Sequence, residues 1–290
     1  MAEIVSLIGT THHPWYHAKT SRPEAELTDD ARGLLGWAAR VQESFDRARP
    51  DVVVIVASDH FHQFFYNNMP QFVVGRMNHY QGTFANEVRE FSLPRIELGG
   101  HRQLATDIIE AGFDHGFDFA FSDEMRLDHA CVVPSLISQP TLHLPVVPVL
   151  TNCGAPPIPT GERFVQLGTA LRRAIEGSNA ASRVAVIASG NLSLEVGGPH
   201  QMMPGSVDPE FDRNAMRWLQ DRDFEALVAE APIDRLMQHG NIAGQFLNLV
   251  TMAAMQDQMT LVHAEAMARR GSPAPCFIYE SKPATEGGAR

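Results

Sequence analysis

Three short apolar runs, each followed at once by polar residues, are the clearest feature of the hydrophobic pattern. The runs are residues 4–9, 52–57 and 184–188, and the polar residues that follow them are 10–14, 58–60 and 189–193. Continuous runs of β-branched and small apolar residues are typical of strands that are buried on both faces of a parallel sheet. The pattern therefore predicts three such strands, each leading into a polar loop.

Apolar positions at helical spacing predict helices along the rest of the chain. The expected helices cover residues 28–48, 101–111, 162–176, 208–220, 223–231 and 241–256. Further strands are expected at 72–74, 117–121, 145–150 and 275–279, with residues 61–100 otherwise in irregular loops and 127–134 in a polar turn.

This alternation of strands and helices indicates an α/β fold. We expect a single domain over residues 1–280, built on a central, mostly parallel β-sheet with helices on both faces. Residues 281–290 are polar and contain glycine, and we expect them to form a disordered tail.

Histidines follow two of the three predicted strands. His12 lies just after the first apolar run and His60 just after the second. Ligands of open α/β sheets bind at the carboxyl ends of the strands, so we expect both imidazoles to face one cleft. Two imidazoles at such a place suggest a bound metal, with Fe(II), Zn(II) and Mn(II) as the candidate ions.

Composition and charge argue against several other classes of partner. Apolar residues make up 44% of the 290 residues and charged residues 20%, as is usual for a globular protein. The net charge of -11 argues against nucleic acid or an anionic membrane surface. No apolar run approaches the ~20 residues of a membrane span, and no signal peptide is evident. Three cysteines without CxxC spacing indicate a reducing compartment, so we expect a cytoplasmic protein.

Six short motifs follow one another along the chain. They are Thr10-Thr11-His12-His13-Pro14, residues 53–60, Gly100-His101, Asp128-His129, residues 189–193 and Glu210-Phe211-Asp212. In their order and spacing they resemble the class III (LigB-type) extradiol ring-cleaving dioxygenases, and the resemblance covers residues 4–256.

The resemblance implies a non-heme Fe(II) enzyme that uses O₂ to cleave the ring of a catechol-like hydroxylated aromatic; another divalent metal is the alternative to Fe(II). In this family two histidines and one glutamate hold the ion. The histidine ligands correspond to His12 and His60, and a histidine that transfers protons near the substrate corresponds to His129. We also expect substrate contacts from the neighbouring loop residues His13, Asp59, Ser193, Leu194 and His200.

Two positions depart from the family pattern. The glutamate ligand corresponds to Gln245, a neutral amide that we expect to bind the ion more weakly and to leave it more electrophilic. After the third strand the family has small-Gly-Gly-hydrophobic-Ser-His, where this chain has Ser189-Gly190-Asn191-Leu192-Ser193-Leu194. Leucine cannot transfer a proton, and the loss of an acid–base group typically forfeits ~10²–10⁴ in rate. Glu195 is the candidate replacement, with His200 as the alternative.

Each of these residues also has an ordinary structural interpretation. His129 would then cap a helix, Gln245 would be a buried amide bonded to the backbone, and Glu195 would be solvated. Asp59 and Asp128 precede site histidines, and each is a candidate either to orient an imidazole or to cap a turn.

Two other functions stay open beside the dioxygenase. One is a non-catalytic homologous subunit of a heteromeric dioxygenase. The other is a metal-dependent hydrolase or lyase that acts on a related aromatic-derived substrate, for which a more Lewis-acidic ion is suited. We expect a homo-oligomer or a hetero-oligomer with a related subunit, and the sequence does not identify the substrate.

Overall fold

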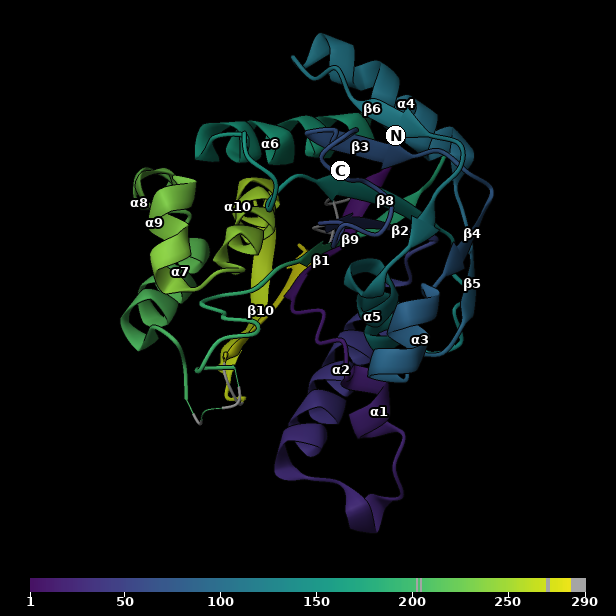
Figure 1. The fold of residues 1–290 in the computed structure, drawn as a ribbon. Coiled ribbons are helices and arrows are strands. Elements are labelled where there is room, and N and C mark those ends of the chain that lie inside the picture. The colour runs from purple at the N-terminus through teal and green to yellow at the C-terminus, as the bar shows by residue number, and fades with distance from the viewer. Residues whose placement is uncertain (202, 204, 270–271, 283–290) are drawn as a thin grey trace, which may run out of the picture.

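The centre of the fold is an eight-stranded β-sheet, seen in a computed structural model that describes residues 1–201, 203, 205–269 and 272–282 (Figure 1). In spatial order the strands are β10 (Met259–Met267), β11 (Ala274–Ser281), β1 (Glu3–Thr10), β9 (Arg183–Ser189), β2 (Val52–Ala57), β8 (Val146–Thr151), β3 (Phe72–Gly75) and β6 (Ala120–Ser122). The four central strands, β1, β9, β2 and β8, pair in parallel. The predicted strands at 4–9, 52–57 and 184–188 are β1, β2 and β9.

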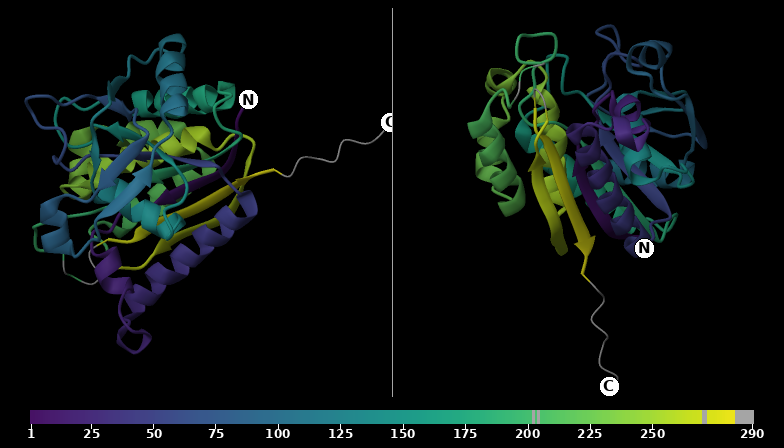
Figure 2. Two further views of the ribbon diagram at one scale, coloured as in Figure 1. Left: turned by 90° about the vertical axis from the view of Figure 1, so that its right-hand side faces the viewer. Right: turned by 90° about the horizontal axis from the view of Figure 1, so that it is seen from below.

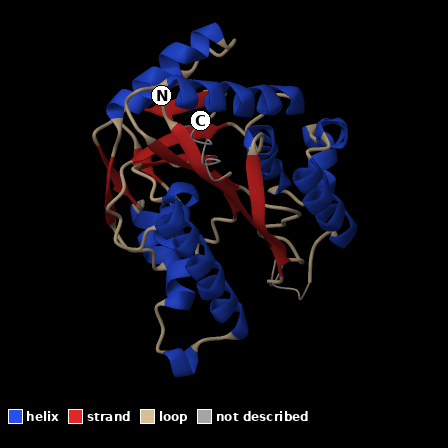
Figure 3. Cartoon of the chain, turned by 180° about the vertical axis from the view of Figure 1, so that it is seen from behind, coloured by secondary structure: helices blue, strands red, loops and turns tan. Residues whose placement is uncertain are grey.

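Helices cover both faces of this sheet (Figure 3), which confirms the predicted fold class. One face is covered by α4 (Arg102–Asp114), α6 (Gly161–Gly177), α7 (Pro209–Asp221) and α10 (Phe246–Met255), and the other by α2 (Asp29–Ala48) and α5 (His129–Ser138). The short helices are α1 (Tyr16–Thr20), α3 (Ala85–Phe91), α8 (Phe224–Glu230) and α9 (Ile233–Leu236), with 3₁₀ turns at Glu24–Glu26, Met237–His239 and Ala243–Gln245. Figure 2 shows the β10–β11 hairpin running alongside α2.

The residues of β2 show why the apolar runs are uninterrupted. Val52, Val54 and Val56 belong to the hydrophobic core on one face of the sheet, and Val53 and Ile55 belong to the core on the other. Successive side chains of a strand point to opposite faces, so a strand covered on both sides needs apolar residues at every position. The polar residues that follow are therefore confined to the strand ends, which is where the site lies.

Several elements differ from the sequence prediction. Residues 61–100 were expected to be mostly irregular, but they contain α3 and two strands of a second sheet, β4 (His79–Gly82) and β5 (Ile96–Gly99), which β7 (Arg126–Leu127) completes. The strand expected at 117–121 begins only at Ala120, because Phe117 and Phe119 are buried in the core outside it.

The polar turn expected at 127–134 is largely the first part of α5. Edge strand β10 was not predicted, because most of its side chains are exposed and give no apolar run. The helix expected at 241–256 is α-helical only from Phe246. Residues 283–290 of the expected tail lie outside the described residues. Within the described ranges, no helix is long and apolar enough to cross a membrane.

Candidate metal centre

Three histidines from different parts of the chain lie together at the carboxyl edge of the sheet. His12 follows β1, His60 follows β2, and His129 is the first residue of α5. The ring centroid of His12 is 5.0 Å from that of His60 and 5.5 Å from that of His129. The centroids of His60 and His129 are 4.1 Å apart. Each of the three histidines has one ring nitrogen in this cluster, and these three nitrogens all lie within 4.8 Å of one another. The structure thus joins the pair expected from the strand ends with a third imidazole.

Ser189 holds the buried ring of His12 in one orientation. Nδ1 of His12 lies 2.8 Å from the Ser189 hydroxyl, which donates its proton to the carbonyl of Ala130 at 2.8 Å. That carbonyl lacks an intrahelical donor because Pro134, four residues later in α5, has no N–H. Since the hydroxyl has given its only proton away, it accepts from His12. The proton of His12 is therefore on Nδ1, and a lone pair is left on Nε2.

The carboxylate of Asp128 holds His60 in the same tautomer. Its Oδ2 accepts from the backbone N–H and from Nδ1 of His60, each at 2.9 Å. Its Oδ1 accepts from the N–H of Ala130 and so caps the start of α5. Because an ionised carboxylate only accepts, the Nε2 atom of His60 also carries a lone pair. Asp128 thus combines both expected roles, and it orients His60 rather than its own neighbour His129.

Glu87 holds His129 by the same pattern. Its Oε1 accepts from the backbone N–H of His129 at 2.8 Å and from Nδ1 at 2.7 Å, and its Oε2 accepts from the N–H of Phe84 at 2.9 Å. The carboxyl group is fully buried, and Figure 1 shows α3, which carries it, beside α5. All three histidines therefore have Nδ1 engaged and Nε2 as the nitrogen left for chemistry.

Burial and mutual repulsion favour the neutral rings of His12 and His129. Burial lowers the pKa of His12 well below its ordinary value, and the neighbouring His60 and His129 lower it further. Burial and then His60 also lower the pKa of His129. Burial alone would raise the pKa of Asp128, but the electrostatic interaction and the hydrogen bond with His60 hold it well below its usual range. Neutral imidazoles need not lose a proton before they bind a cation.

Two amide side chains lie against the imidazoles. Nε2 of Gln245 is 2.7 Å from Nε2 of His60, and Oε1 of Gln245 accepts from the Asn191 amide at 2.5 Å. The same Asn191 nitrogen is 3.4 Å from Nε2 of His12, and Asn191 Oδ1 accepts from the Thr11 hydroxyl at 2.7 Å. Gln245, the position expected from the family pattern, is therefore at the histidine cluster.

The donor set fits a divalent transition-metal ion. Imidazole nitrogen suits iron, zinc, copper and nickel. In metal sites the second ring nitrogen of a histidine ligand is usually bonded to a carboxylate or other oxygen, which fixes the tautomer. His12, His60 and His129 each have such a partner. The amide of Gln245 lies beside them with its nitrogen toward His60, and its oxygen accepts from Asn191.

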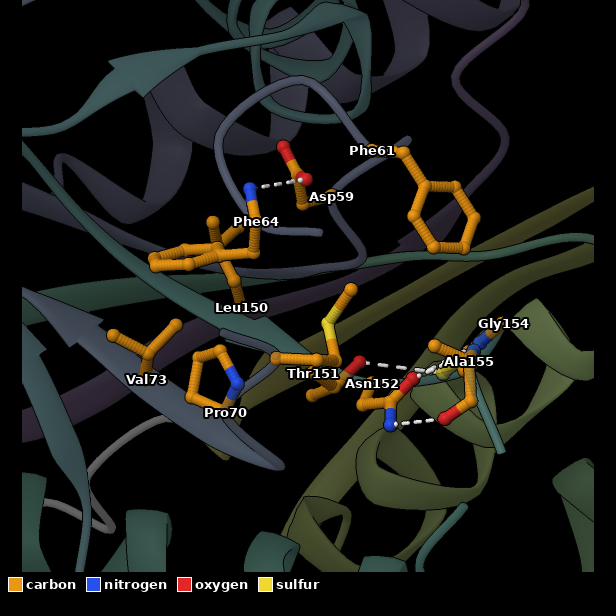
Figure 4. Close-up of a pocket in the computed structure, with 12 residues that line it drawn as sticks. Asp59, Phe61, Phe64, Pro70, Val73, Leu150, Thr151, Asn152, Gly154 and Ala155 are labelled. Carbon is orange, nitrogen blue, oxygen red and sulfur yellow. Dashed lines mark hydrogen bonds between the residues drawn. The ribbon is translucent and has the colours of Figure 1, made fainter. Parts of the chain in front are cut away.

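Asp59 organises its own loop. Its carboxylate accepts from the backbone N–H groups of His62, Gln63 and Phe64 at 3.0 Å each, and burial raises its pKa. With Phe64 it lines a cavity of about 10 Å³ (Figure 4), which is room for roughly one water molecule. None of the three clustered histidines lines that cavity.

Two other residues expected at the site have neighbours of their own. His13 is half-buried, and its ring meets Trp15 edge-on at 5.7 Å. Burial, and then the positive charge of Arg269, lower the pKa of His13. Ser193 is fully buried and donates to the carboxylate of Asp212 at 3.0 Å. The structure therefore places Ser193 in a network with Asp212.

The residues proposed to replace the missing acid–base group lie in the loop after β9. Leu194 is half-buried, and its backbone N–H donates to the carbonyl of His239 at 3.1 Å. The Glu195 carboxylate accepts from the backbone N–H of the exposed His200 at 3.2 Å. Within the described residues, no hydrogen bond joins Glu195 or His200 to the three histidines.

Sequence reasoning missed Glu87 and gave Asn191 no role. Glu87 lies in the stretch that was expected to be irregular, where no periodic pattern marks a helix. Asn191 had a usable signal, because it is a polar residue just past the end of a buried strand, as His12 and His60 are.

Comparison with known proteins identifies related sequences and a related fold. Residues 6–274 match the family described as the catalytic LigB subunit of aromatic ring-opening dioxygenase. A 2,3-dihydroxyphenylpropionate/2,3-dihydroxicinnamic acid 1,2-dioxygenase of Photorhabdus laumondii is 34% identical over 209 residues, which are 72% of this chain and 61% of that protein. A second such enzyme, from Pseudomonas putida, is 33% identical over 59% of this chain and 51% of its own length. The matched part thus spans half to three fifths of these relatives.

A solved structure shares the fold. The crystal structure of an uncharacterised protein from Escherichia coli K12 superposes with a TM-score of 0.54 at 13% identity, and the match covers 96% of this chain and 100% of that one.

Proposed function

Because this chain belongs to the LigB family of catalytic subunits of aromatic ring-opening dioxygenases, we propose that it is a metal-dependent, extradiol-type dioxygenase that cleaves the ring of a catechol-like aromatic compound. The observation that carries the proposal is the cluster of His12, His60 and His129, with a ring nitrogen of each within 4.8 Å of one of each other. Fe(II) is the proposed ion. When bound, it would supply a Lewis acid for two adjacent substrate oxygens and an electron source for O₂.

In this proposal His12 and His60 hold the ion through Nε2. Ser189 and Asp128 support that role because they keep the proton of each ring on Nδ1. Gln245, beside His60, is proposed as the neutral counterpart of the family's glutamate ligand.

His129 is proposed to hold and transfer a proton at Nε2. Glu87 supports this role because it fixes the opposite nitrogen and the backbone N–H of the same residue. Glu195 is retained as the proposed second acid–base group, and His13, Asp59, Ser193, Leu194 and His200 are retained as proposed substrate contacts. A homo-oligomer, or a hetero-oligomer with a related subunit, is likewise a proposal.

Oxygen uptake by the iron-loaded protein tests the activity. The protein is loaded with Fe(II) under anaerobic conditions and mixed with aerated catechols, beginning with 2,3-dihydroxyphenylpropionate because two relatives are named for it. We expect O₂ consumption equal to the ring-opened product formed, and no consumption by His60→Asn. No O₂ consumption with any of a panel of catechols, in protein that retains its iron, would contradict the proposal.

A second candidate is a non-catalytic homologous subunit. It is favoured by the hydrogen bond that the Gln245 amide donates to the ligand nitrogen of His60, together with leucine at position 194, where the family has a histidine. This candidate predicts no bound iron. A hydrolase or lyase would differ from both, since it would bind metal and convert substrate without consuming O₂.

A further inference from the structure

The hydrogen-bond partners of His60 and Gln245 fix how the Gln245 amide is turned. Asp128 faces both the backbone N–H and Nδ1 of His60, so this histidine donates from Nδ1. Oε1 of Gln245 accepts from Asn191, so the nitrogen of the same amide faces Nε2 of His60 at 2.7 Å and presents its N–H there. The orientation of the Gln245 amide thus matches the tautomer that the carboxylate on the far side of the ring imposes on His60.

The chain of donors continues through Asn191. With its N–H toward His60, Gln245 turns Oε1 to Asn191, which donates to it at 2.5 Å. The Oδ1 atom of Asn191 in turn accepts from the hydroxyl of Thr11 at 2.7 Å. Thr11, Asn191, Gln245 and His60 therefore donate in the same direction, and Asp128 is the final acceptor. Such series of hydrogen bonds strengthen their members cooperatively.

This arrangement opposes cation binding at His60. A lone pair that accepts a hydrogen bond cannot bind a cation at the same time, so the N–H of Gln245 and a metal ion compete for Nε2 of His60. Rotation of the amide would turn Oε1 toward the ion. It would also set the Gln245 N–H against the N–H of Asn191, which are two donors facing each other. Asn191 thus holds Gln245 in the orientation that disfavours the metal.

We propose that Asn191 is a positioning residue that lowers the metal affinity of this site by fixing the amide of Gln245 with its N–H toward His60. The inference rests on the proposed function only in taking His60 as a metal ligand. Asn191 and Gln245 lie 54 residues apart and are in direct contact. They stand where the family pattern has glycine and glutamate, and the hydrogen bond between them makes these two positions one unit.

A double-mutant cycle measured by Co(II) titration of the full chain tests the proposal. The proteins are the natural chain, Asn191→Ala, Gln245→Glu and the double variant, with the visible absorption of bound Co(II) as the readout. Asn191→Ala should tighten Co(II) binding about 2- to 10-fold, the equivalent of one net hydrogen bond. In the Gln245→Glu background the same change should tighten binding less, because a carboxylate has no N–H to misdirect and only the 3.4 Å contact of Asn191 with Nε2 of His12 is removed.

Asn152→Ala is the matched control. Asn152 is a buried amide whose side chain bonds within its own turn and to Gln71. Its replacement should leave Co(II) affinity unchanged, which separates a specific effect from general loosening. If Asn191→Ala does not fold, as judged by circular dichroism, Asn191→Gly takes its place in the cycle.

The outcomes separate this inference from the proposed function. Co(II) bound equally well by the natural chain and Asn191→Ala, or an equal gain in both backgrounds, overturns the inference and leaves the dioxygenase proposal standing. No Co(II) bound by the natural chain, with binding gained in Asn191→Ala, supports the inference and contradicts a metal-loaded enzyme. No binding by any of the four proteins overturns both.

Discussion

Replacement of Asp128 by asparagine should weaken both the fold and the metal site. The carboxylate accepts three hydrogen bonds, two from His60 through Oδ2 and one from Ala130 through Oδ1, and its side chain is only 2% exposed. Asparagine has the same shape, but it offers one acceptor oxygen and one donor. Its oxygen can accept from His60 or from Ala130. Its NH₂ group then faces the N–H of the other residue, so two donors oppose each other.

The expected losses of stability and of metal affinity follow from the hydrogen-bonding groups that asparagine leaves unpaired. If the asparagine oxygen stays with His60, the start of α5 loses its cap, which costs about 1 kcal/mol. Because this lost cap leaves the buried N–H of Ala130 without an acceptor, the loss in the free energy of unfolding can reach about 1–3 kcal/mol. If the oxygen turns to Ala130, His60 loses its oriented tautomer, and metal affinity should fall by about 10–100-fold.

Urea unfolding followed by circular dichroism, together with Co(II) titration, measures both effects. Asp123→Asn is the control, because the side chain of Asp123 is 42% exposed and its partners are the side chains of Arg76 and Arg102. Exposed ion pairs contribute about 1 kcal/mol or less. If Asp128→Asn matched this control in both stability and Co(II) affinity, the role assigned to Asp128 would be wrong.

Three further predictions concern the groups around the cluster. Glu87→Gln leaves one acceptor oxygen for the N–H groups that the carboxylate now serves, so urea unfolding should show a loss of about 1–3 kcal/mol; a change within error would contradict this. A Cβ at Gly190 would lie 2.6 Å from the carbonyl oxygen of Gln245, so Gly190→Ala should cost about 1–3 kcal/mol in the same assay, and an unchanged midpoint would refute it. Burial lowers the pKa of His12 and His129, so the unfolded chain binds more protons near their ordinary pKa of about 6.5. The stability they contribute is therefore present above about pH 6.5 and is lost as the pH falls below it; urea unfolding at about pH 7.5 and about pH 5.5 should show the loss, and equal values would contradict it.

The central parallel strands and the place of the site could be predicted from local sequence. The run that became β2 is apolar at every position, and the run that became β1 is interrupted only by the buried Ser6, because both faces of the sheet are covered. Their carboxyl ends therefore had to meet at one edge, and His12 and His60 do lie 5.0 Å apart there. This inference needed only strand periodicity and the geometry of parallel sheets.

The partners of the histidines could not be predicted in this way. Glu87 reaches His129 only because α3, in a stretch without a regular apolar pattern, packs beside α5. Residues 127–134 were expected to form a turn, but most of them belong to α5, which accommodates Pro134 because Ser189 supplies the donor that the proline lacks. Such contacts join segments that are far apart along the chain, and no local pattern encodes them.

Iron content is the most direct test of the proposed metal centre. The protein is purified anaerobically with Fe(II) supplied and analysed for metal beside His60→Asn, in which the amide keeps a donor toward Asp128 but removes Nε2. We predict about one iron per chain in the natural protein and none in the variant. No iron in the natural protein, or equal iron in both, would contradict a metal site at these histidines.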